Sequence, residues 1–368
     1  MFDPKTRSEA PAPQLSPLES PWRRALGRGR RFLKVHGHKL WWLHSAYALT
    51  LGAFVASFAQ KGFDHARWLA VTLGSAWLLM ILFFRVYGSG AGQSNLEHAP
   101  PKAKIRFYVM TYALKNLYQG MLFFLVPFYW KSTTPDAPNV WFVILLAVCA
   151  VLSTLDIVFD RVLMRWRSVA SLFHGIILFG CLNLVFPALL ADTRTLYSLL
   201  GAGAVTVVGF WTLHVPVVEL RNKLYAALFL GSIAAGTGLV YVARTAIPPV
   251  PMHLSRGAVG PVVLEDGRLA MEVTRLHFSV IKQLMAVTDV VIPGGKGDRL
   301  LHVWRLNGVP IARMAEELSR VEGPFGTVRL KSSLTASEIP EQRTGSWHVD
   351  VETEDGQLVG RVAFVVIE

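Results

Sequence analysis

The feature that most limits the fold of this chain is a series of long apolar segments between residues 41 and 244. A helix needs about 20 predominantly apolar residues to cross the hydrocarbon core of a bilayer. The segments that meet this requirement are 41–59, 67–86, 105–129, 140–158, 169–190, 196–217 and 225–244. The sequence therefore predicts a multi-span α-helical membrane bundle of about seven helices.

The distribution of Lys and Arg predicts the orientation of this bundle, because cytoplasmic loops carry an excess of both residues. With the N-terminus inside, the inner loops hold Arg85, Lys102, Lys104, Arg106, Arg161, Arg165, Arg167, Arg221 and Lys223. The outer loops hold Lys61, Arg67, Lys131, Arg194 and Arg244. Seven spans then place the N-terminus in the cytoplasm and the C-terminus on the opposite side.

Residues 1–40 are expected to form a disordered and polybasic cytoplasmic tail, with nine Lys or Arg against three acidic residues. Its first half is rich in Pro and Ser, which is typical of disorder. The basic run "WRRALGRGRRFLKVHGHKLWW" is too long for the basic region of a secretory signal. We expect it to precede an uncleaved span and to attract the anionic lipids of the bilayer.

The net charge of +12 would suit nucleic acid if it lay on a soluble domain. Residues 252–368 instead carry 13 basic and 15 acidic side chains, so the excess charge belongs to the membrane half. We therefore expect no nucleic-acid partner.

A change of pattern at "AIPPVPMH" marks a domain boundary, because these prolines favour a short, stiff connection. The expected domains are the tail at 1–40, a transmembrane helical domain at 41–246 and an extracytoplasmic β-sandwich domain at 252–368.

The C-terminal region alternates apolar and polar residues with the period of a half-buried strand. Trp347, Val349 and Val351 share one face of such a strand, and Asp355-Gly356 suits the tight hairpin turn that follows it. Together with Asn307-Gly308 and further alternating segments, this indicates six or seven short strands. The expected fold is an all-β antiparallel sandwich, immunoglobulin-like in architecture.

Four pieces of this region, in order, resemble a known family: "LLHVWRLNG", "VRLKSS", "GSWHVDV" and "DGQLVGRVAFVV". They resemble the bacterial domain of unknown function 2914 family, whose members pair a His-x-Trp strand and an Asn-Gly turn with a Gly-x-Trp strand and a closing Asp-Gly hairpin. The resemblance covers roughly the last quarter of the chain. The membrane half is similar to the family of unknown function 5924, which is found attached to such domains. The resemblance implies an extracytoplasmic module in a bacterial envelope protein, and it supplies no activity or site residues.

Polar residues inside the predicted spans are candidates for a function in the membrane, because each one is costly there without a partner or purpose. Lys115, Asn116 and Gln119 lie in the third segment, with Asp156 near the inner end of the fourth and Asn183 in the fifth. They could line a polar pocket or a path for a solute or proton. Alternatively, they form interhelical hydrogen bonds that fix the bundle.

Aromatic residues and histidines are the candidate contact residues of the sandwich: His302, Trp304, Trp347 and His348. Such tryptophans can stack on sugars or peptides, but a Trp that alternates with Val in a strand is more often part of the core. Two histidines without a third ligand predict no metal site.

The other polar groups offer no recognisable chemistry. The acidic residues Glu316, Glu317, Glu352, Glu354 and Asp355 are expected at solvent-facing or turn positions. Cys149 and Cys181 fall within apolar spans, and no nucleophile motif or phosphate-binding glycine loop occurs. We therefore expect no catalytic residue and no cofactor.

These features favour a non-enzymatic membrane protein that displays a sandwich domain to an envelope protein or glycan. The alternative is a transporter or membrane-embedded enzyme with its polar site around Lys115.

Overall fold

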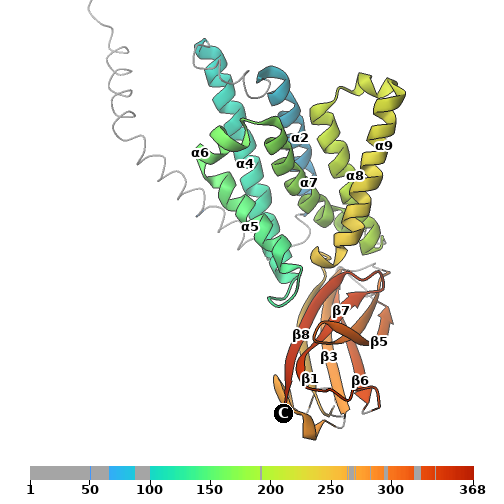
Figure 1. The fold of residues 1–368 in the computed structure, drawn as a ribbon. Coiled ribbons are helices and arrows are strands. Elements are labelled where there is room, and N and C mark those ends of the chain that lie inside the picture. Colours follow the sequence, from blue (N-terminus) through green and yellow to red (C-terminus); the bar gives the residue numbers. More distant parts are fainter. Residues whose placement is uncertain are drawn as a thin grey trace, which may run out of the picture. The chain divides into compact units, whose positions relative to one another are not determined.

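The computed structural model describes Thr50 and residues 66–87 and 100–368, apart from short gaps at 191–192, 263, 265–268, 270, 282, 294–296, 319–324 and 336. The contacts join Ala48–Glu368 into one compact unit. Helices form its N-terminal part and strands its C-terminal part (Figure 1). The predicted first span, 41–59, and the tail at 1–40 lie outside the described residues.

The helical part contains seven α-helices within the described residues. They are α2 (Ala66–Tyr87), α4 (Pro101–Lys131), α5 (Val140–Thr154), α6 (Asp156–Val158), α7 (Arg167–Leu189), α8 (Thr195–His214) and α9 (Lys223–Val242). Shorter helical turns are η3 (Phe159–Leu163), η4 (Val217–Arg221) and η5 (Ala243–Ala246). Helices therefore occupy each of the predicted spans after the first.

Three of the described helices are long and apolar enough to cross a membrane: Arg167–Leu189, Thr195–His214 and Lys223–Ala246. A fourth is reached if Val140–Thr154 and Asp156–Leu163 form one broken span. The apolar run of α2 is shorter, and the lysines and amides of α4 lower its hydropathy. The count of seven spans therefore stays a prediction.

The segment predicted as one continuous helix over 140–158 is broken, which corrects that expectation. α5 ends at Thr154, Leu155 is extended, and the chain then turns by 92° into α6 and η3. The hydroxyl of Ser153 donates to the carbonyl oxygen of Ala150 and that of Thr154 to Val151, each at 2.7 Å. Such side-chain bonds compete with backbone bonds and bend helices.

The helices α2, α4, α5, α7 and α8 share one apolar core, to which they contribute Phe83, Leu122, Leu146, Leu184 and Leu199, all buried. In contrast, α9 has no buried residue, although it is apolar around its whole circumference. A helix of this kind is expected to face lipid rather than water.

The C-terminal part contains eight strands within the described residues. They are β1 (His253–Gly260), β2 (Arg275–His277), β3 (Gln283–Pro293), β4 (Arg299–Leu306), β5 (Val309–Leu318), β6 (Phe325–Thr335), β7 (Gly345–Thr353) and β8 (Leu358–Ile367). One sheet has the order β1-β3-β6 and the other β2-β8-β7-β4-β5. β1 was not predicted, because "HLSRGAVG" lacks a clear alternation of apolar and polar residues.

One strand pair departs from the expected all-antiparallel arrangement. The three residues of β2 pair in parallel with Val365–Ile367 at the end of β8, whereas the other pairs are antiparallel. The chain reaches this sheet edge through the long connection after β1, which allows a parallel approach. The immunoglobulin-like architecture stays a prediction.

The two sheets share an apolar core that includes Leu284 of β3, Trp304 of β4, and Trp347 of β7. The rings of Trp347 and Phe364, paired across β7 and β8, stack with centroids 5.9 Å apart. Both tryptophans are fully buried. This confirms that they are core residues, which a Trp alternating with Val suggested.

The two predicted hairpin turns differ in detail. Asn307 and Gly308 have φ of 49° and 84°, as a tight two-residue turn requires. In the second hairpin only Gly356 has positive φ, at 80°, and four residues separate β7 from β8. This wider loop meets the helical part, as described below.

Candidate functional site

Lys115, predicted as the centre of a polar site, forms an ion pair with Asp156 at the start of α6. The exposed fractions of the two side chains are 7% and 19%, so the pair is largely shielded from solvent. One turn further along α4, the amide of Gln119 donates to the carbonyl oxygen of Ser153 at 2.8 Å. Both contacts fall where α5 is broken. A break leaves backbone groups without helical partners, and Gln119 satisfies one of them.

Asn116 and Asn183 do not join this group. Asn116 is exposed and donates to the backbone oxygen of Tyr112 on its own helix at 2.7 Å. The buried amide of Asn183 donates to the hydroxyl of Tyr129 at 3.0 Å. Tyr129 lies 14 residues after Lys115, or about 21 Å along a helix. The predicted polar residues therefore form two separate groups.

The Asn183 group connects the helices with the segment that leads to the strands. Asn183 also donates to the backbone oxygen of Pro248 at 3.3 Å, in the proline-rich segment that was expected to be an extended connection. Ile247, Val250 and Met252 of this segment are buried. It is therefore packed against its surroundings rather than exposed as a linker.

His302 is a satisfied core residue. Its side chain is fully buried between the hydroxyls of Thr288 and Ser332, with ring nitrogens 2.7 Å from each oxygen. The same Ser332 hydroxyl accepts from the indole nitrogen of Trp304 at 3.0 Å. Burial lowers the pKa of His302 to about 4, because it disfavours the charged ring. His302 and both tryptophans are therefore inaccessible to a partner on the surface.

His348 lies on the opposite face of β7 from Trp347 and is half-buried. On this face Asp350 and Glu352 are 1% and 5% exposed. The expectation that Glu352 faces solvent is therefore wrong. Arg305 accounts for the difference, since it donates to Asp350 at 2.9 Å and to Glu352 at 2.7 Å.

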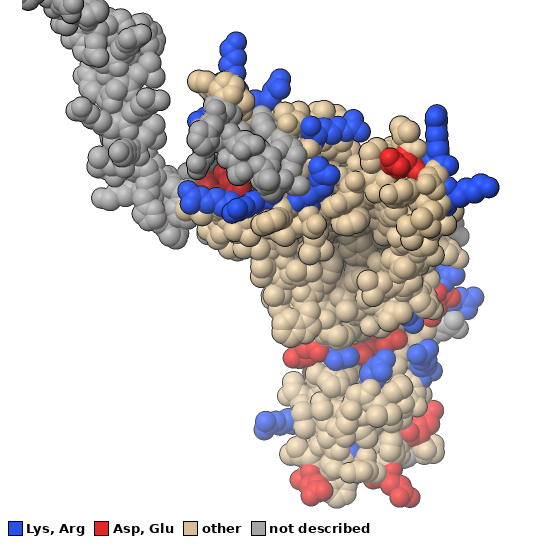
Figure 2. Space-filling view, turned by 45° about the horizontal axis from the view of Figure 1, so that its top comes forward, with Lys and Arg blue, Asp and Glu red and all other residues tan. Residues whose placement is uncertain are grey.

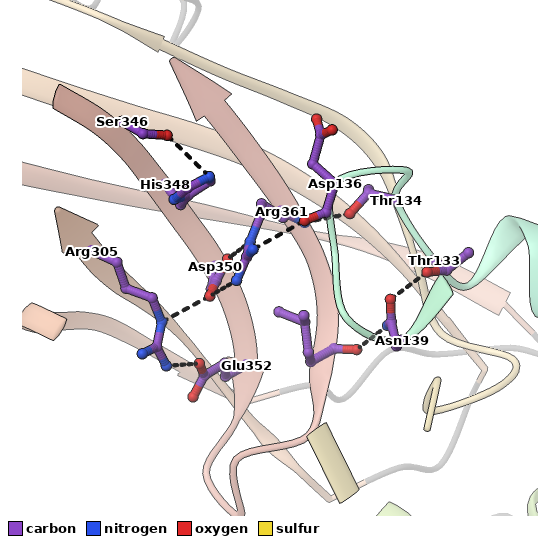
Figure 3. Close-up of polar contacts among 11 residues, drawn as sticks. Thr133, Thr134, Asp136, Asn139, Arg305, Ser346, His348, Asp350, Glu352 and Arg361 are labelled. Atoms are coloured by element: carbon purple, nitrogen blue, oxygen red, sulfur yellow. Dashed lines mark hydrogen bonds and ion pairs between the residues drawn. The ribbon is translucent and has the colours of Figure 1, made fainter. Parts of the chain in front are cut away.

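A second arginine, Arg361 of β8, connects this polar face to the helical part (Figure 3). Its Nε and Nη2 donate to the two carboxylate oxygens of Asp350 at 2.6 and 2.8 Å. Its Nη1 donates to the backbone oxygen of Asp136 at 3.0 Å, and its backbone N–H to the hydroxyl of Thr134 at 3.1 Å. Thr134 and Asp136 belong to the loop between α4 and α5.

The same loop makes a further contact with β8. The fully buried amide of Asn139 donates to the backbone oxygen of Leu358 at 3.0 Å, and its side-chain oxygen accepts from Thr133 (Figure 3). Both polar atoms of the Asn139 side chain therefore have a partner.

The loop between β7 and β8 is held by the ends of other helices. Arg194, just before α8, forms ion pairs with Glu354 at 2.6 Å and Asp355 at 2.7 Å. Arg244, just after α9, donates to the backbone oxygen of Asp355 at 2.6 Å. These two acidic residues do lie in a turn, as expected, but they bind arginines of the helical part.

Asp298, directly before β4, completes the contact. Its buried carboxylate accepts from the backbone N–H of Thr195 at 3.1 Å and also from the Thr195 hydroxyl. A carboxylate at the N-terminus of a helix such as α8 is favourable, because it satisfies unpaired N–H groups and interacts with the helix dipole. We call this set of contacts the helix–strand junction. Its helical side consists of 133–139, Arg194, Thr195 and Arg244, and its strand side of Asp298, 354–358 and Arg361.

Sequence reasoning missed the helix–strand junction, although one signal was present. The alternation pattern places Arg305, Asp350 and Arg361 on the non-core faces of their strands, and these three strands lie side by side in the structure. Such a set predicts an ion-pair network. It does not say which loop covers that network.

Two family models match the chain. The model of the family of unknown function DUF5924 matches residues 28–283, more than half of the sequence. The chain belongs to this family. Residues 297–366 match the model of the protein of unknown function DUF2914. Both resemblances stated from the sequence are thereby confirmed. A comparison with the curated proteins finds no match.

Each of the two family matches includes strands of the C-terminal part. The DUF5924 match extends beyond the helices through β1 and β2, and the DUF2914 match covers β4 to β8. β2 nevertheless pairs with β8, so the regions matched by the two families contribute to one sheet.

Within the described residues, no three His, Cys, Asp or Glu side chains are arranged to hold a metal ion. The helix–strand junction consists of ion pairs and hydrogen bonds between protein groups.

Proposed function

We propose that this chain is a seven-span protein of the bacterial inner membrane that holds a β-sandwich module at the periplasmic surface. The N-terminus lies in the cytoplasm, and the module binds an envelope protein or glycan without catalysis. The helical part serves as an anchor that fixes the position of the module.

The helix–strand junction is the observation that supports this proposal most. Two helix ends, those of α8 and α9, and the loop between α4 and α5 contact the same end of the strand region through hydrogen bonds and ion pairs. A freely tethered domain would need only its linker. The contacts instead indicate that the orientation of the module matters.

The distribution of charge supports the membrane location and the orientation. Figure 2 shows Lys and Arg gathered at one end of the helical part, followed by a wide uncharged band and then mixed charges towards the strands. An uncharged band between two charged zones suits a bilayer, and the end rich in Lys and Arg suits the cytoplasmic side.

Reporter fusions test the orientation. Alkaline phosphatase, which is active only after export, should be active when fused after Glu368 and inactive when fused after Arg165, in a predicted inner loop. A fluorescent protein that folds only in the cytoplasm should give the reverse pattern. Fluorescence after Glu368 would refute the proposed orientation.

The second candidate is a transporter or membrane-embedded enzyme, which the broken helix favours. Breaks in membrane helices next to ionisable residues often form substrate or ion sites. However, Lys115 and Gln119 bind Asp156 and a backbone oxygen of the broken helix, which favours a structural role. Replacing the pair by Met and Leu should leave an anchoring function intact and abolish transport or catalysis.

A further inference from the structure

A basic cavity lies at the end of the helical part where α2 ends, α7 begins and α8 ends. Its volume is about 410 Å³, and its polar lining includes Arg85, Arg167, Thr212 and His214. Its described lining contains no acidic side chain. Such a cavity has the charge and size to receive an anionic group.

Arg167 gives an independent indication of a ligand. Its Nε is buried and has no hydrogen-bond partner among the described residues. The guanidinium lies 5.5 Å from the centroid of the Phe84 ring, and this contact leaves Nε without a hydrogen bond. An unpaired buried donor of this kind is unfavourable, and a phosphate oxygen would satisfy it with a charge-assisted bond.

An apolar cavity of about 370 Å³ begins next to the basic one and continues between α7, α8 and α9. The two meet at His214, whose Nε2 lies 2.9 Å from the hydroxyl of Ser171. The Phe210 ring stacks on the His214 ring with centroids 4.3 Å apart. Ser171 and Phe210 line the apolar cavity, whereas His214 lines the basic one.

The apolar cavity is long enough for an acyl chain that crosses one leaflet. On α7, the distance from Arg167 to Phe179, which lines the far part of the cavity, is 12 residues or about 18 Å. Half of the hydrocarbon core is about 15 Å thick. A lipid chain that starts at the basic cavity therefore has room along the groove to the middle of the bilayer.

Glycines keep the helices around this groove close together. A Cβ at Gly236 would approach Val207 Cγ2 to 2.5 Å, so α8 and α9 meet there only because the residue is glycine. At Gly203 of α8 a Cβ would approach Val240 Cγ2 to 3.0 Å, which is also closer than ordinary contact. The groove is thus defined by fixed walls rather than by a loose gap between helices.

We propose that an anionic phospholipid occupies both cavities, with its phosphate at Arg85 and Arg167 and one acyl chain in the groove between α7, α8 and α9. This site is distinct from the anionic lipid expected at the basic tail. The placement of this lipid in the inner leaflet rests on the proposed orientation, whereas the anion-binding chemistry of the site does not.

Native mass spectrometry of the full-length chain tests the proposal. Phosphatidylglycerol and phosphatidylcholine with identical acyl chains are compared, and glycerol phosphate is added as a competitor that has the headgroup but no chain. We expect retained phosphatidylglycerol, little phosphatidylcholine and no competition. Arg85→Gln and Arg167→Gln should each weaken retention about fivefold, from about 1 kcal/mol per arginine near a membrane surface.

Arg165→Gln is the matched control, because it removes the same charge two residues from Arg167 and does not line either cavity. It should leave retention unchanged. Equal weakening by this control, equal retention of phosphatidylcholine, or displacement by glycerol phosphate would each overturn the proposal. Elution volume and thermal stability of all variants should match those of the parent chain, which shows that they are folded.

A phosphatidylglycerol with a photoreactive group at its acyl terminus tests the groove directly. We expect labelling near Phe179 on α7 and near Val240 on α9. Labelling confined to other surfaces, or cross-links that show residues 41–59 of the chain itself filling the groove, would refute the acyl-chain site.

Discussion

Replacing Arg361 by Met should destabilise the strand region and loosen the helix–strand junction. Asp350 is 1% exposed and accepts three charge-assisted hydrogen bonds, two of them from Arg361. Removing one partner of a buried ion pair costs about 3 to 5 kcal/mol when the other charge is left alone. Arg305 remains bound to Asp350, so we expect a loss of about 2 to 3 kcal/mol in the free energy of unfolding.

Arg329→Met is the matched control within the same strand region. Arg329 makes a similar bidentate pair with Asp289, at 2.7 and 2.9 Å, but its side chain is 44% exposed, against 17% for Arg361. Exposed pairs contribute about 0.2 to 1 kcal/mol. The two variants therefore remove the same kind of pair in different surroundings.

Thermal unfolding of the full chain, followed by tryptophan fluorescence, measures the difference. Both buried tryptophans of the strand region report on this core. With about 4 °C per kcal/mol for a domain of this size, Arg361→Met should lower Tm by about 8 to 12 °C and Arg329→Met by less than about 4 °C.

Hydrogen exchange separates the junction from the core. Arg361→Met should speed amide exchange at residues 133–139, because the bond to the backbone oxygen of Asp136 is lost. Arg329→Met should leave exchange there unchanged. Equal Tm losses for the two variants, or unchanged exchange at 133–139 in Arg361→Met, would refute the reasoning.

Two further predictions concern buried charges. The pKa of His302 is lowered from 6.5 to about 4. Below pH 6.5 the unfolded chain therefore binds a proton that the folded chain excludes. The free energy of unfolding should fall between pH 6.5 and 4, by up to about 3 kcal/mol. His302→Gln should flatten the dependence of Tm on pH. An unchanged slope would show that His302 does not cause this pH dependence. Lys115→Met should cost about 3 kcal/mol by leaving Asp156 unpaired, and adding Asp156→Leu should recover most of it in detergent unfolding assays. A double variant as unstable as the single one would show that the pair does more than balance charge.

The strand region was the part of the fold most open to prediction. Trp347 and Val349 alternate with polar residues, and Asn307-Gly308 demands positive φ, so faces and a turn could be assigned locally. β1 could not be found in this way, because its pairing with β3 joins segments that are more than 20 residues apart. The parallel pairing of β2 with β8 depends on the path of the chain and leaves no local pattern.

The polar residues of the helical part were likewise only partly predictable from the sequence. That Lys115 needs a partner follows from the cost of a charge in an apolar helix, and Asp156 was an evident candidate. That the pair closes a break in α5 was not predictable, since a helix pattern over 140–158 carries no sign of a 92° bend. Asn183 was grouped with Lys115 only as a polar residue of the predicted spans, and its bonds to Tyr129 and Pro248 place it in a separate group.

The sequence by itself determined most of the apolar helices and strands and where the basic residues lie, because periodicity, turn residues and the cost of burying charge act over short stretches of chain. Only the tertiary structure decided the helix–strand junction, the burial of Asp350 and Glu352, and the cavities beside Arg167. These features depend on which surfaces meet. A carboxylate that looks solvent-facing along its own strand becomes buried when two arginines and a loop from another part of the chain cover it.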